Sequence, residues 1–267
     1  MKPQRRIPSR RPLVLVVPAV CALAFVVAPL LGLLLRTPWQ ILPDRLFTAE
    51  VGQALRLSLV CASLATLLCL IGGVPLAWLL ARGAVPGRGV IRALITVPLV
   101  LPPVVGGVAL LLVLGRRGMV GQYLYEWFGV TLPFTTAAAV IAETFVALPF
   151  LVIAVEGALR AADPRFEEAA ATLGASRWLI FRRVTVPSVL PGIVAGAVLC
   201  WARALGEFGA TITFAGNFPG RTTTMPLAVY LTLQTDPDEA IVLSLLLLAV
   251  SVGVLIALRE HWIRGVA

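Results

Sequence analysis

Residues 168–187 read EAAATLGASRWLIFRRVTVP, the one long polar interruption in a chain made mostly of membrane-length apolar runs. Asp163 is a good N-cap and the proline after it suits the first helical position, so a helix is expected to begin at about residue 164. Gly174 stands where a left-handed residue would end that helix. Ser176 can cap a second helix, expected to end before Pro187, because proline disfavours helix in the preceding residue. The stretch predicts two short helices that meet at a glycine elbow.

Composition places the chain among membrane proteins. Hydrophobic residues make up 59% of the sequence, charged residues only 13%, and the mean hydropathy is +0.96. Runs long enough to span a bilayer occur at 13–35, 57–81, 93–115, 132–155, 189–214 and 240–258. The first run could instead be a signal peptide, but its 23 apolar or small residues exceed the roughly 7–15 of a signal core. We therefore predict an all-α membrane protein with six transmembrane helices, the first retained.

The basic residues indicate how the chain is oriented. With the N-terminus in the cytoplasm, the outer loops hold only five of the 22 lysines and arginines, namely Arg36, Arg45, Arg116, Arg117 and Arg221. Arg56 and Arg203 stand at or within spans, and the rest are cytoplasmic, including those of the basic segment 1–12. Because cytoplasmic loops carry the excess of positive charge, both termini and residues 168–187 are expected inside. This distribution favours a membrane protein over one that binds nucleic acid.

Two runs contain residues that are costly in a membrane helix. The run 93–115 holds three prolines and the pair Gly106-Gly107, so it is expected to be kinked and to face protein or water. Glu143 lies near the middle of 132–155, where an isolated carboxylate costs about 2.5–3.5 kcal/mol. It must face the bundle interior, either protonated or bonded to a neighbouring helix.

The fifth run carries the sequence Ala202–Thr211, ARALGEFGAT. Arg203 and Glu207 are four residues apart, so they are expected to share one helical face and to pair. Gly206 and Gly209 permit close approach of a neighbouring helix. The pair is either a buried support of a helix contact or, with these glycines and Thr211, part of the wall or gate of a translocation path. The residues alone leave both interpretations open.

The stretch at 168–187 resembles the EAA loop of ABC importer permeases. That pattern is EAA, three residues, Gly, nine residues, then Ile-x-Leu-Pro, and valine replaces both aliphatic residues here. In that family the loop forms the coupling helix that docks on the ATP-hydrolysing subunit. The resemblance implies a coupling loop at 156–188 that depends on Glu168, Ala169, Ala170, Gly174, Arg177 and Pro187. Composition alone would also suit an amphipathic loop on lipid headgroups, with arginines facing phosphate and Trp178 at the interface.

A second resemblance concerns the substrate. Ala202–Thr211 followed by AGNFPGRTTTMPLAVY at 215–230 is similar to the signature of molybdate and tungstate permeases, and the proline-rich 98–107 resembles them too. The likeness covers about 50–260 and leaves the first helix, 13–35, outside the core. It implies a type I ABC importer permease in the bacterial cytoplasmic membrane, working as a homodimer with ATPase subunits and an extracytoplasmic oxyanion-binding protein. Sulfate and thiosulfate permeases share the first half of the signature and are the alternative.

Several functions lack the residues they require. Lys2 is the only lysine, so the chain has no phosphate-binding loop ending in Lys-Ser/Thr, and ATP must be hydrolysed by a partner. One histidine and four cysteines without CxxC spacing support neither a metal site nor a disulfide framework. No catalytic cluster is evident, which disfavours a membrane enzyme. A self-sufficient secondary transporter or channel is disfavoured as well, because the internal repeats expected of one are not seen in the sequence. We expect no catalytic residues and no cofactor on this chain.

Overall fold

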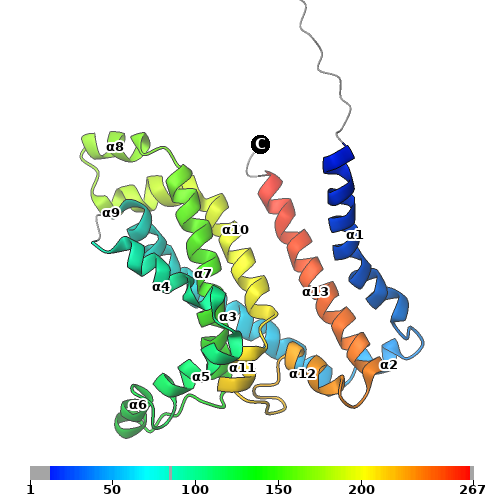
Figure 1. Ribbon diagram of the computed structural model, residues 1–267. Helices are drawn as coiled ribbons and strands as arrows, with labels where there is room; N and C mark the ends of the chain where they lie inside the picture. The colour runs from blue at the N-terminus through cyan, green and yellow to red at the C-terminus, as the bar shows by residue number, and fades with distance from the viewer. Residues whose placement is uncertain (1–12, 84–85, 265–267) are drawn as a thin grey trace, which may run out of the picture.

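The computed structural model describes residues 13–83 and 86–264, and all regular structure in these ranges is helical (Figure 1). The basic segment 1–12 lies outside the described residues. The long helices are α1 Leu13–Arg36, α3 Ala49–Arg82, α7 Thr136–Ala161, α10 Val186–Leu205 and α13 Pro237–Arg264. The intermediate ones are α4 Arg88–Val100 and α5 Pro103–Leu114. The short ones are α2 Leu42–Leu46, α6 Gly121–Phe128, α8 Arg165–Thr172, α9 Arg177–Ile180, η1 Phe181–Thr185, α11 Gly209–Phe214 and α12 Met225–Thr232.

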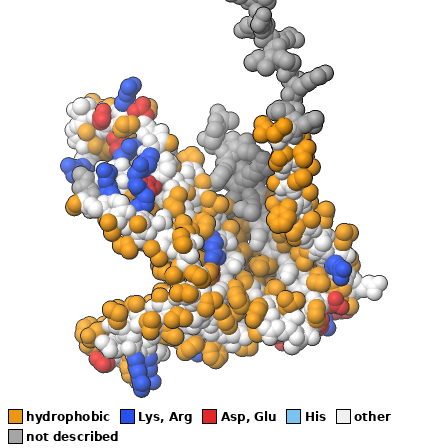
Figure 2. Space-filling model, in the orientation of Figure 1, with side chains coloured by type: hydrophobic (Ala, Val, Ile, Leu, Met, Phe, Trp, Pro, Cys, Tyr) orange, Lys and Arg blue, Asp and Glu red, His pale blue; other side chains and the backbone are white. Residues whose placement is uncertain are grey.

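Helices α3, α7 and α10 form the core of the bundle. Their contacts bury small side chains, including Cys61 and Cys69 of α3, Ala142 of α7 and Cys200 of α10, which lets the helix backbones approach closely. Helix α1 packs beside α13 at the edge of the bundle (Figure 1). Hydrophobic side chains cover the middle of the face in Figure 2, whereas charged side chains gather near α8 and α9 and at the opposite end. This pattern is that of a membrane-spanning bundle.

In the described part of the chain, five helices are long and apolar enough to cross a membrane, and up to six if the bent pair α4 and α5 counts as one span. The helix direction bends by 117° between α4 and α5. The kink predicted in 93–115 is therefore confirmed and is sharper than expected. Leu101 is extended, and Pro102 and Pro103 follow it, so the α4 helix cannot continue. Helix α5 then packs on α11, where a Cβ at Gly107 would lie 2.8 Å from the Ala210 carbonyl oxygen.

The prediction that the second short helix ends before Pro187 is wrong. Helix α9 continues through the π-helical turn η1 into α10, and the Val186 N–H bonds the carbonyl of Phe181, five residues back. The widened turn accommodates Pro187, which lacks an N–H and sits in the first turn of α10. The Ser188 hydroxyl donates to the Thr185 carbonyl at 2.8 Å, which satisfies a backbone group near the proline. Residues 177–205 therefore form one continuous helix that is long and apolar enough to cross a membrane.

The prediction of one uninterrupted span over 189–214 is also wrong. Helix α10 ends at Leu205, Gly206 caps it, and a separate helix α11 begins at Gly209. Two glycines, Gly206 and Gly209, flank the break and weaken the helix there. The break is stabilised by a side chain, as the geometry around Glu207 shows below.

Candidate functional site

The glycine elbow has the geometry of a Schellman motif. Gly174 is left-handed, with a φ of 81°, as predicted. Its N–H donates to the carbonyl of Ala171 at 3.0 Å, and the N–H of Ala175 donates to the carbonyl of Ala170 at 3.1 Å. The Asp163 carboxylate caps the helix start through the N–H of Arg165 at 3.0 Å. The carbonyls of Ala170 and Ala171, four and three residues before the glycine, therefore close the end of this helix.

Helix α8 presents an apolar pair outward. Phe166, in the first turn of α8, is 67% exposed, and Leu173, the C-cap residue of α8, is 88% exposed. They are seven residues apart, which places them on one side of the helix. Glu168 and Ala169 are exposed as well. Sequence reasoning missed this pair, and the signal that could have revealed it was the i, i+7 spacing within a charged segment.

Ion pairs fix the base of this loop to the bundle. Arg82, the last residue of α3, donates to the Ala162 carbonyl at 3.1 Å, and its Nε lies 3.5 Å from a Glu167 carboxylate oxygen in the first turn of α8. One turn from the end of α7, Glu156 accepts from Arg92 of α4 and from Arg160. Arg82 therefore links the ends of α3 and α7 to α8, a role that the sequence did not reveal.

The other two predicted loop residues lie beyond the elbow. Arg177 is the first residue of α9, whose N-terminus is capped by Ser176 through the Leu179 N–H at 3.3 Å, as predicted. Pro187 lies ten residues further on, inside the membrane-length helix. The structure thus places Glu168, Ala169 and Ala170 on α8, separated by the elbow from Arg177 and Pro187.

Arg203 and Glu207 pair, as predicted, but on different elements. The Arg203 Nη2 at the end of α10 lies 2.6 Å from Glu207 Oε2, and Glu207 stands in the break between α10 and α11. The other carboxylate oxygen accepts from the N–H of Ala210 at 2.8 Å. The Glu207 side chain is almost fully buried, whereas that of Arg203 is 27% exposed. One carboxylate therefore joins the end of α10 to the start of α11.

The remaining predicted gate residues surround this carboxylate in different ways. Gly209 lies against α5, because a Cβ there would come within 2.9 Å of the Pro103 Cβ. Gly206 has more room, since its nearest neighbour in that direction is an oxygen at 3.6 Å. Thr211 is buried, and among the described residues its hydroxyl has no hydrogen-bond partner. The close approach predicted at the glycines thus occurs at Gly209.

Glu143 lies in the bundle interior, as its position in the span required. It is 1% exposed, and within the described chain one of its carboxylate oxygens has no hydrogen-bond partner. Its charge would interact unfavourably with that of Glu207. The helices α7, α10 and α11 therefore bring a second buried carboxyl toward the Arg203–Glu207 pair.

The loop at 215–224 is shaped by its own polar side chains. The Thr223 hydroxyl donates to the Asn217 side chain at 2.7 Å, and the Thr222 hydroxyl accepts from the Phe218 N–H at 2.8 Å. Gly216 and Gly220 are left-handed. Helix α12 follows, and its first N–H, of Met225, donates to Ser58 of α3. These residues of the signature hold the loop in place.

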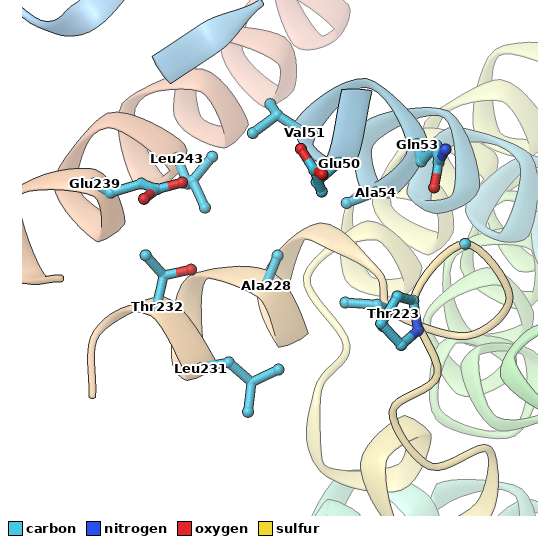
Figure 3. Close-up of a pocket in the computed structure, with 12 residues that line it drawn as sticks. Glu50, Val51, Gln53, Ala54, Thr223, Ala228, Leu231, Thr232, Glu239 and Leu243 are labelled. Carbon is cyan, nitrogen blue, oxygen red and sulfur yellow. The ribbon is translucent and has the colours of Figure 1, made fainter. Parts of the chain in front are cut away.

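A pocket of about 200 Å³ opens beside this loop, at the opposite end of the bundle from α8 (Figures 1 and 3). Glu50 and Gln53 of α3, Ala228 and Thr232 of α12, and Glu239 of α13 approach it from three sides (Figure 3). Arg45 anchors α13 there, with ion pairs to Asp236 at 3.1 Å and Glu239 at 2.9 Å. The pocket is a recess on that end of the molecule.

Residues 73–265 match the family described as binding-protein-dependent transport system inner membrane component. The chain belongs to this family. It is 49% identical to the molybdenum transport system permease protein ModB of Mycobacterium bovis over 91% of this chain and 92% of that one. The ModB of Escherichia coli K12 is 44% identical over 83% of this chain and 97% of its own length. A sulfate transport system permease protein, CysW of Synechocystis, is 37% identical over 83% of this chain and 80% of that one.

A solved structure supports the fold. The permease has a TM-score of 0.76 with a chain of a bacterial ABC transporter involved in the import of the acidic polysaccharide alginate, at 19% identity and covering 94% of both chains. The predicted type I ABC importer permease fold is thereby confirmed.

The two bonds of Glu207 predict different effects for two substitutions. Glu207→Gln removes the charge but keeps an oxygen that can accept from the Ala210 N–H, whereas Glu207→Leu removes both. Because a lost helix cap costs about 1 kcal/mol, Glu207→Leu should unfold at a lower temperature than Glu207→Gln. Thermal unfolding of the purified variants measures the difference. The same two changes at Glu126, an exposed residue of α6, serve as the control, and equal unfolding temperatures at position 207 would contradict the capping role.

Proposed function

We propose that this permease is the membrane subunit of an ATP-driven importer of molybdate or tungstate. The observation that carries the proposal is the 49% identity to a molybdenum permease over nearly the whole of both chains. The more distant sulfate permease keeps sulfate or thiosulfate as the alternative. The permease itself carries no catalysis, and ATP is hydrolysed on a partner subunit.

Helix α8 is the proposed docking element for that ATPase. Its outward apolar pair, Phe166 and Leu173, offers a surface to bury against a groove, and Glu168 stands beside it at the polar edge. The contacts of Arg82 with Ala162 and Glu167 make α8 move together with the ends of α3 and α7. A displacement of the ATPase would therefore reach the spanning helices directly.

The proposed orientation puts both termini and α8 in the cytoplasm. The start of α1, the end of α13 and α8 point toward the same end of the bundle, and that end carries most of the basic residues (Figure 1). The pocket beside α12 then faces outward, where an extracytoplasmic binding protein would deliver the anion. Exposed apolar residues on α4 and α5, such as Leu94 and Leu112, suit contact with a second permease copy or with lipid.

Arg203 and Glu207 are the proposed gate, with Gly206, Gly209 and Thr211 around them. An unpaired arginine would hold a dianion strongly, whereas a translocation path must release its cargo. Pairing with Glu207 lowers that attraction in the closed state. Because the same carboxylate holds α11, separation of the pair would free the arginine for the oxyanion and loosen the packing of α11 on α5.

Transport in vesicles of defined composition tests the function. We expect the permease, reconstituted with its ATPase and binding protein, to accumulate molybdate and tungstate only when ATP is supplied on the ATPase side. A large excess of sulfate should leave molybdate uptake nearly unchanged, because a binding protein selects the cargo. Uptake of sulfate in preference to molybdate would establish the alternative. Uptake without ATP would overturn the proposal in favour of a secondary transporter.

The coupling role of the elbow predicts a specific defect for Gly174→Val. Valine in a left-handed conformation costs about 1–2 kcal/mol, so the end of α8 should shift. Gly129, at the end of α6, has a similar φ of 65° and equally open surroundings, so Gly129→Val is the matched control. We expect both variants to lose similar stability, and only Gly174→Val to raise the number of ATP molecules hydrolysed per anion transported, several-fold. A parental ratio in Gly174→Val would show that the loop does not couple.

The gate is tested by Arg203→Gln, Glu207→Gln and the double variant, scored for abundance in the membrane and for uptake. A structural pair predicts that each single change lowers abundance, since an orphaned partner of a buried pair costs about 3–5 kcal/mol, and that the double variant recovers both abundance and uptake. A gate predicts near-normal abundance with altered uptake or with ATP hydrolysis in the absence of substrate. Full recovery of uptake in the double variant would contradict the gate.

A further inference from the structure

A second pocket, of about 310 Å³, lies on the elbow side of the molecule between α3 and the α9–η1 segment. Its lining is Pro75 and Trp78 of α3 with Arg177, Trp178 and Phe181. Phe181 stands between the two tryptophans, edge-on to Trp78 at a ring-centroid distance of 5.9 Å and stacked with Trp178 at 5.7 Å. The walls are therefore almost wholly aromatic and apolar, with one guanidinium among them.

A π-helical turn adjoins this pocket. It begins at Phe181 and widens the backbone where α9 joins the apolar helix α10. Turns of this kind are frequent at functional sites in helices. Trp178 remains 68% exposed in spite of its stacking, so the outer side of the pocket is uncovered in this chain.

Three arginines lie on the segment that forms one wall of the pocket. Arg177 lines the pocket, and Arg182 and Arg183 are exposed on the following turn. Within the described part of the chain, none of these three arginines forms an ion pair. Glu167 of the neighbouring α8 is engaged by Arg82. The segment therefore offers free guanidinium groups next to an apolar pocket.

The position of the pocket at the end of a membrane-length helix favours lipid as its binding partner. Arg177 begins the membrane-length helix that runs to Leu205, so the pocket lies at one end of this span, where the helix would leave the hydrocarbon layer. Tryptophan is enriched at that depth, and arginines there contact lipid phosphates. Protein contacts have another surface available, since the outward residues Phe166 and Leu173 lie on the other side of the glycine elbow.

We propose that this pocket, formed by Pro75, Trp78, Arg177, Trp178 and Phe181, is a binding site for an anionic phospholipid. The acyl chain lies against the aromatic walls, and the headgroup phosphate is held by Arg177 with Arg182 and Arg183. The two halves of the loop then have different partners: α8 meets the ATPase, and α9 with η1 meets lipid. This assignment is independent of which anion the transporter carries.

Native mass spectrometry of the permease–ATPase complex tests the site. The complex is equilibrated with an equimolar mixture of palmitoyl-oleoyl phosphatidylglycerol and phosphatidylcholine, and the retained lipids are counted. We expect selective retention of phosphatidylglycerol. Because each arginine near an anionic headgroup contributes a modest attraction, the double change Arg182→Gln and Arg183→Gln should lower that selectivity by roughly thirtyfold.

Two further variants separate the parts of the site. Trp178→Ala, at an exposed position with little risk to folding, should weaken retention of both lipids by removing an apolar wall. Arg116→Gln with Arg117→Gln removes two arginines that lie beside α6, away from this pocket, and should leave retention at the parental level. Equal retention of the two lipids by the parent, or unchanged selectivity in the Arg182 and Arg183 variant, would overturn the proposal. Retention that is seen in the permease alone but lost when the ATPase binds would instead make the pocket a protein contact.

Discussion

Every break or widened turn in a membrane helix leaves backbone groups that lipid cannot satisfy, and this structure depends on how two breaks and one π turn are closed. Between α4 and α5, the residues at the break include two prolines, which have no N–H to leave unsatisfied. At Pro187, a π turn and the hydroxyl of Ser188 take up the displaced bonds. Between α10 and α11, a side-chain carboxylate accepts a helix N–H. Each solution is different, and only the last involves a charge.

That charge links the breaks to one another. Glu207 holds the start of α11 and the end of α10, and α11 packs on α5 through Gly107 and Gly209, where no side chain would fit. The second half of one broken span therefore rests on the second half of another. A change in the pairing of Glu207 would therefore reach α5 by direct contact, as the proposed gate requires.

The sequence predicted the parts of the fold that depend on local chemistry. The apolar runs, the capping by Asp163 and Ser176, and the left-handed Gly174 followed from residue type and spacing, and the structure confirms them. A helix end was predicted before Pro187, where the helix continues, and no end was predicted at Leu205, where the helix stops. Both predictions were wrong because each outcome depends on a hydrogen bond that residue type does not reveal. A π turn has no simple composition signal, and the role of Glu207 requires knowing where the Ala210 N–H points. The contacts of Arg82 were missed for the same reason, since they join residues about 80 positions apart.

Two interpretations of residues 168–187 competed at the level of sequence, a coupling loop and an amphipathic surface segment. The structure divides the stretch at Gly174, and the two halves differ in character. Before the glycine, α8 projects from the bundle with exposed apolar residues that a partner protein can cover. After it, α9 and η1 form one wall of an aromatic pocket that Arg177 also lines, and the chain continues into α10. Gly174 turns the chain between the two halves, but α8 still contacts α9 and η1 across it, and Arg82 ties α8 to the ends of α3 and α7. If α8 docks on an ATPase and the second half on lipid, as proposed, a load on α8 would therefore reach both the spanning helices and the segment at the membrane surface.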